Sequence, residues 1–78
     1  MDTAVLEAEV NAILSGYEAN FAILAPHLER AEVRSQLASS AWFARDLVNA
    51  GEESQAVPAH TLAAWDARVT RLEATLGA

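Results

Sequence analysis

Large apolar side chains recur at intervals of three and four residues along most of the chain, which is the spacing of one face of an α-helix. No segment shows the sustained two-residue alternation of apolar and polar positions that a half-buried strand requires. The sequence therefore predicts an all-α fold. We expect three helical arms with short connections, forming a small antiparallel helical bundle in a single domain over residues 1–78.

The first arm is predicted over about residues 3–24, with Asp2 or Thr3 as its N-cap. Its large apolar residues share one stripe: Leu6, Val10, Ile13, Leu14, Tyr17, Phe21 and Leu24. A second stripe without charge consists of small residues: Ala8, Ala12, Gly16 and Ala19. Glycine inside a helix costs about 1 kcal/mol relative to alanine, so this stripe indicates close approach of another backbone. The alternative is an exposed alanine-rich face that only reflects helix propensity.

The middle arm is predicted from Pro26, which suits the first turn of a helix, to about residue 50. Its apolar positions before and after Ser39 and Ser40 fall out of phase, and either serine can cap a new segment. We therefore expect a kink or a break there. A break divides the arm into helices over about residues 26–38 and 40–50, which makes the total three or four.

Gly51 is expected to end the middle arm, because glycine is the usual residue just after a helix C-terminus. The segment GEESQAV is the only polar linker in the chain. The last helix is predicted over about residues 58–76. Its apolar stripe consists of Leu62, Trp65, Val69, Leu72 and Leu76.

A five-residue pattern, AWFAR at residues 41–45, returns as AWDAR at residues 64–68. Trp65 of the second copy lies in the middle of its apolar stripe. In the first copy the helical phase assigns Phe43 to the core and leaves Trp42 on the side that carries Arg45. A tryptophan among polar residues can anchor a partner protein. The alternative is that Trp42 packs under the linker or against another helix.

Eleven acids face five Arg and no Lys, which gives a formal net charge of −6. Residues 1–29 hold five of these acids and no Arg. Nucleic-acid binding needs clustered basic side chains, so we expect no direct contact with DNA or RNA and a protein partner with a basic surface instead. None of the Arg residues has an acid three or four positions away. We expect Arg68 and Arg71 to pair with the acidic first helix.

The hydrophobic fraction is 53%, yet no apolar run reaches the roughly 18 residues of a membrane span, so we expect no membrane partner. The first residues carry acids where a signal peptide needs basic residues. No cysteine is present, which excludes disulfides and thiolate metal sites. A cytoplasmic location is the default expectation.

The residues that carry chemistry lack the arrangement that catalysis requires. His27 and His60 have no second His or Cys at metal-ligand spacing. The chain has no glycine-rich phosphate loop, and the serines look like caps or lie within helices. We expect no enzyme activity, no cofactor and no metal.

Two functions remain. The first is a non-catalytic acidic protein that binds another protein through Trp42, Arg45, Glu7 and Glu18, and that could inhibit by masking a basic nucleic-acid-handling surface. Small acidic phage proteins, including anti-CRISPR inhibitors, are similar in size and charge, although no residue motif carries the likeness. The second is a self-associating structural subunit, a homodimer through Ala8, Ala12, Gly16 and Ala19.

Overall fold

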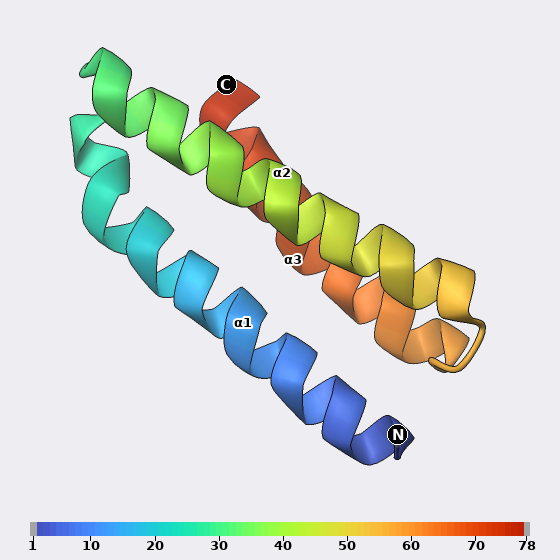
Figure 1. The fold of residues 1–78 in the computed structure, drawn as a ribbon. Helices are drawn as coiled ribbons and strands as arrows, with labels where there is room; N and C mark the ends of the chain where they lie inside the picture. Colours follow the sequence, from blue (N-terminus) through green and yellow to red (C-terminus); the bar gives the residue numbers. More distant parts are fainter. Residues whose placement is uncertain (1, 78) are drawn as a thin grey trace.

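A computed structural model describes residues 2–77 of the chain. It contains three α-helices, α1 (Thr3–Leu24), α2 (Ala31–Ser54) and α3 (Ala59–Gly77), and a short 3-10 helix η1 (Ala25–His27) between α1 and α2. No strand occurs among the described residues, so the all-α prediction is confirmed. The molecule is elongated, with extents of 41 × 18 × 15 Å. Consecutive α-helices run in opposite directions, so the start of α1 lies at the same end as the connection between α2 and α3 (Figure 1).

Helix α1 has the predicted bounds, and Asp2 is its N-cap. The Oδ1 atom of Asp2 accepts a hydrogen bond of 3.1 Å from the backbone N–H of Ala4, which satisfies one of the free donors at the helix start. The residue itself has extended backbone angles (φ −66°, ψ 131°), as an N-cap requires.

The middle arm begins later than predicted, at Ala31 instead of Pro26. Pro26 lies in η1, where the backbone N–H of Leu28 donates to the carbonyl of Ala25 at 3.3 Å. Arg30 then adopts an extended conformation (φ −85°, ψ 126°) and is the N-cap of α2. The residues around Pro26 thus form a tight turn instead of the first turn of α2.

The predicted break at Ser39 and Ser40 is not found, because α2 runs without interruption from Ala31 to Ser54. The Ser40 hydroxyl donates to the carbonyl of Gln36 at 3.2 Å, so it finds a partner within the helix instead of capping a new one. The stripe that α2 buries is also in phase throughout: Leu37, Ala41, Ala44 and Val48. The large apolar residues alone fall out of phase, because two of the four buried positions of α2 are alanines.

Helix α2 also continues past Gly51, which was expected to end it. The left-handed C-cap position is occupied by Gln55 (φ 57°) instead. Gly51 has a different use, because a Cβ atom placed there would lie 3.3 Å from Cζ3 of Trp65 and 3.4 Å from Cδ2 of Leu62. The glycine therefore allows α2 to approach α3 closely.

Helix α3 begins one residue after the predicted position, and the backbone N–H groups of Thr61 and Leu62 donate to the carbonyl of Pro58. One hydrophobic core is formed by side chains of all three α-helices together with Val57 of the linker. The buried members are Val10, Leu14, Phe21, Leu37, Ala41, Ala44, Val48, Val57, Trp65, Val69 and Leu72. Gly51 of α2 faces Trp65 and Leu62 of α3, so these two helices pack closely at that point.

Candidate functional site

The two aromatic residues of the AWFAR segment both lie on the surface. Trp42 is 64% exposed and Phe43 is 55% exposed. Their ring centroids are 5.1 Å apart with an angle of 82° between the planes, so the rings meet edge to face. The assignment of Phe43 to the core is therefore wrong, because Ala41 and Ala44 take the core positions of this segment. Trp42 does not pack under the linker, and it forms with Phe43 an exposed aromatic pair.

Arg45, predicted to bind a partner, bonds to three side chains of α3. Its guanidinium forms ion pairs with Asp66 and with Glu73, the latter at 2.7 Å, and donates to Thr70 at 3.3 Å. These hydrogen bonds raise the pKa of Arg45 above its ordinary value and lower the pKa of Glu73 below its own. Arg45 joins α2 to α3.

Glu18, also predicted to bind a partner, is held by Arg68 of α3 at 2.7 Å. The hydrogen bond from Arg68 lowers the pKa of Glu18. The same guanidinium donates to Asn11 at 2.8 Å and to Ser15 at 3.1 Å, and Trp65 Nε1 donates to the Asn11 side chain at 3.2 Å. This network joins α1 to α3. The expected pairing of Arg68 with the first helix is thus confirmed.

Arg71 and Glu7 have no ion-pair partner within residues 2–77. Arg71 acts on α1 only at longer range, through a Coulombic effect that helps to lower the pKa of Glu18. Glu7 is half-buried on α1. Of the four residues predicted to bind a partner, the structure therefore leaves Trp42 and Glu7 without a charged or aromatic partner on another helix.

The small-residue stripe of α1 lies on the surface over its whole length. All four members, Ala8, Ala12, Gly16 and Ala19, are exposed. A Cβ atom placed on Gly16 would meet nothing within 4 Å. Val5 and Ile23 lie beside the stripe and are 48% and 69% exposed. This face packs against no other part of the described chain.

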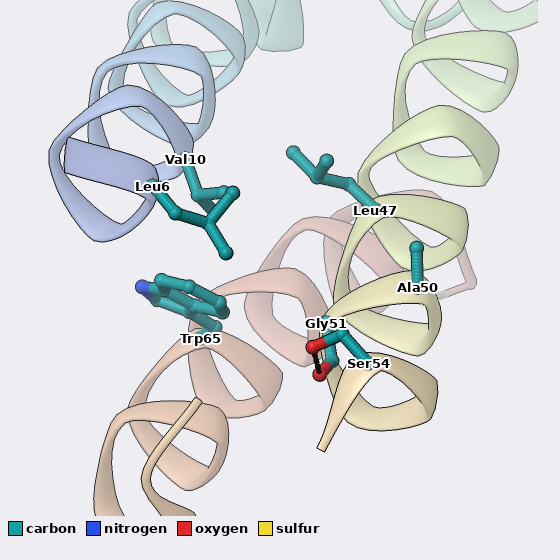
Figure 2. Close-up of a pocket in the computed structure, with 7 residues that line it drawn as sticks. All are labelled: Leu6, Val10, Leu47, Ala50, Gly51, Ser54 and Trp65. Atoms are coloured by element: carbon teal, nitrogen blue, oxygen red, sulfur yellow. Dashed lines mark hydrogen bonds between the residues drawn. The ribbon is translucent and has the colours of Figure 1, made fainter. Parts of the chain in front are cut away.

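A pocket that the sequence reasoning missed lies where the three helices meet near the start of α1. Its volume is about 140 Å³, and its lining consists of Leu6, Val10, Leu47, Ala50, Gly51, Ser54 and Trp65. Figure 2 shows Leu6 and Val10 directed from α1, Leu47 from α2 and the Trp65 ring from α3 toward the same space. The sequence signal that could have found it is Gly51, a small residue opposite Trp65.

Most of the net charge lies in the half of the molecule that holds this pocket. That half consists of residues 2–12 of α1 and residues 45–67, because the pocket joins the start of α1 to the end of α2 and to Trp65. It carries seven acids and one Arg, whereas the remaining residues carry four acids and four Arg. Arg68 lies just beyond this half and donates to Asn11 within it, so the half that holds the pocket is the more acidic of the two.

Within residues 2–77, no three His, Cys, Asp or Glu side chains lie close enough together to hold a metal ion. His27 and His60 are both exposed. The helices of the described chain are each too short or too polar to cross a lipid bilayer. No protein-family model, curated protein or solved structure gives a significant match to this chain.

Proposed function

We propose that this chain is a small non-catalytic helical bundle that binds another protein through a surface centred on Trp42 and Phe43. The observation that carries the proposal is the exposure of this aromatic pair, 64% and 55%, on the outer side of α2. Exposing two large aromatic rings to water is unfavourable by about 25 cal/mol per Å² of apolar area. Tryptophan is also among the residues that contribute most to binding energy at protein interfaces.

The charge of the surface supports a basic partner. Asp46 follows the aromatic pair on α2 and is exposed, and no ion pair is formed by it within the described residues. The acidic half of the molecule extends from there. Such a potential attracts a basic protein surface and repels nucleic acid. An inhibitor that masks a basic nucleic-acid-handling surface is one function of this kind.

The test is a double variant, Trp42→Ala with Phe43→Ala, compared with the matched variant Ala63→Ser on the exposed side of α3. The double variant should keep the helicity of the parent chain, because neither ring lies in the core. The double variant should no longer capture the partner protein that the parent chain captures. The Ala63→Ser variant should still capture it. Equal capture by both variants contradicts the proposal, and so does unfolding of the double variant.

A second candidate function is a homodimer through the small-residue stripe of α1. It is favoured by the exposure of all four stripe residues together with Val5 and Ile23. The variant Gly16→Leu distinguishes a dimer interface on this stripe from an open face, because a tight helix–helix interface does not accept the larger side chain, whereas an open face does. Light scattering at micromolar concentration should show a dimer that Gly16→Leu dissociates. A monomer at that concentration removes this candidate.

A further inference from the structure

The pocket in the acidic half is lined almost entirely by apolar atoms. Among the α2 residues that line the pocket, only Ser54 has a polar side chain. Its hydroxyl donates to the carbonyl of Gly51 at 2.7 Å and accepts from the N–H of Ala56 at 3.2 Å. The indole N–H of Trp65 is taken by Asn11. The volume of about 140 Å³ is close to that of an apolar cavity of roughly 150 Å³ that holds a benzene molecule. The pocket therefore fits one aliphatic or aromatic side chain.

The pocket and the aromatic pair belong to one apolar strip. Phe43, Leu47 and Ala50 are separated by four and three residues, so they lie on the same side of α2. Leu47 and Ala50 line the pocket, whereas Phe43 lies one turn beyond it. At a rise of about 1.5 Å per residue, Phe43 and Ala50 are about 10 Å apart along the helix axis. This distance equals two turns of an α-helix, the separation of side chains seven residues apart.

Carboxylates stand beside the pocket on both helices that wall it. Glu9 lies three residues after Leu6 on α1, and Asp46 and Glu53 lie four residues before and three residues after Ala50 on α2, so each is a helix-surface neighbour of a lining residue. All three carboxylates are exposed, and none has an ion-pair partner within residues 2–77. By contrast, Glu18 and Glu73, which lie outside this half, are each paired with Arg. The apolar opening is thus bordered by negative charge that the chain itself does not neutralise.

The pocket and the adjoining strip of Phe43, Leu47 and Ala50 together form a groove. We propose that this groove receives an amphipathic basic helix of a partner protein, which places one apolar side chain in the pocket and a second against Phe43. The inference rests on the proposed function and specifies its partner. An amphipathic helix presents apolar anchors seven residues apart on one face, and Lys or Arg on its flanks would meet Glu9 on one side and Asp46 and Glu53 on the other. A second copy of this chain is a poorer occupant, because it would bring acidic surface against acidic surface.

The first experiment measures binding of a fluorescein-labelled synthetic helix with Leu at two positions seven residues apart and Lys and Arg on its polar face. Fluorescence anisotropy should show saturable binding to the intact chain, and the affinity should fall as salt is raised. Two control peptides replace either both Leu by Ala or every Lys and Arg by Glu. Each control should bind at least about tenfold more weakly. Equal binding of the Ala peptide, or failure of the parent peptide to bind, overturns the proposal.

Variants of the chain then locate the binding. Ala50→Leu fills the pocket from an exposed helical position, and Ala63→Leu makes the same change on the far side of α3. We expect Ala50→Leu to weaken binding of the basic peptide about tenfold and Ala63→Leu to leave it unchanged. A charge variant, Glu9→Gln with Asp46→Asn and Glu53→Gln, should weaken it similarly, whereas Glu29→Gln with Glu32→Gln should not. Circular dichroism checks that each variant folds.

The outcomes separate this inference from the proposed function. If Trp42→Ala with Phe43→Ala loses the partner while Ala50→Leu and the charge variant retain it, the aromatic surface binds but the groove does not, and the inference is wrong. If no variant changes partner binding, both proposals are wrong. A dimer of the chain that Ala50→Leu dissociates would show that a second copy occupies the groove, which also overturns the inference.

Discussion

The two similar segments AWFAR and AWDAR have opposite burial in the fold. In residues 41–45 both alanines are buried and the tryptophan is 64% exposed, whereas in residues 64–68 both alanines are exposed and the tryptophan is 2% exposed. The two segments lie on neighbouring helices, where Trp65 requires small residues opposite it and α2 supplies them, including Gly51. The difference shows that nearly identical segments can bury different residues. Which residues are buried depends on the side of the helix that packs against another helix.

The largest expected difference lies between the two tryptophans. Trp65→Ala should lower the free energy of unfolding by about 3–5 kcal/mol, because it removes the largest buried side chain and leaves a cavity. Trp42→Ala should change it by no more than about 0.5 kcal/mol, because the ring is mostly exposed. Urea denaturation followed by circular dichroism measures both. Similar losses for the two variants would contradict the assigned burial.

The alanines of the two segments should differ in the reverse sense. Ala44→Leu should lower the free energy of unfolding by about 1–3 kcal/mol, because Ala44 is 0% exposed and the larger side chain has to displace the core residues around it. Ala67→Leu, at the corresponding position of the second segment, should change it by no more than about 0.5 kcal/mol, since that residue is exposed. The same denaturation experiment applies. A tolerated leucine at position 44 would mean that the core around Ala44 is not closely packed.

The smallest expected effect concerns the arginines that close the two segments. Arg45 and Arg68 lower the pKa values of Glu73 and Glu18, so these carboxyls add stability at pH values above the unfolded pKa of about 4.3. That stability is lost as pH falls through the lowered folded pKa values. Both carboxylates are about one-third exposed or more, at 43% and 34%, so the combined contribution should be no more than about 1 kcal/mol.

The measurement compares the parent chain with Glu18→Gln combined with Glu73→Gln in chemical denaturation between about pH 6 and pH 3, around the carboxyl range. The double variant should be less stable than the parent near pH 6, and the difference should shrink as the pH falls. Glu29→Gln is the control, because Glu29 is exposed and forms no ion pair within the described residues. A difference that grows toward low pH would reverse the assigned sign.

Much of the secondary structure could be predicted from the sequence, because helix propensity, capping and apolar spacing are properties of neighbouring residues. The bounds of α1 and the Asp2 cap are examples, and α3 differs from its predicted bounds by one residue at each end. Composition likewise determines the net charge of −6 and the lack of cysteine. The errors concentrate in α2, where a proline, two serines and a glycine have meanings that depend on what packs against them.

Only the tertiary structure decided which face of α2 is buried and where the charge gathers. The helical phase of Phe43 predicts a core position, yet Phe43 is 55% exposed, and Ala41 and Ala44 are the buried residues of this segment. The pocket and its carboxylates combine residues from both ends of the sequence, with Leu6 and Trp65 brought together only by the packing of three helices. Local sequence determines how a helix is patterned. Which of its sides becomes core depends on contacts between residues that are distant in the chain.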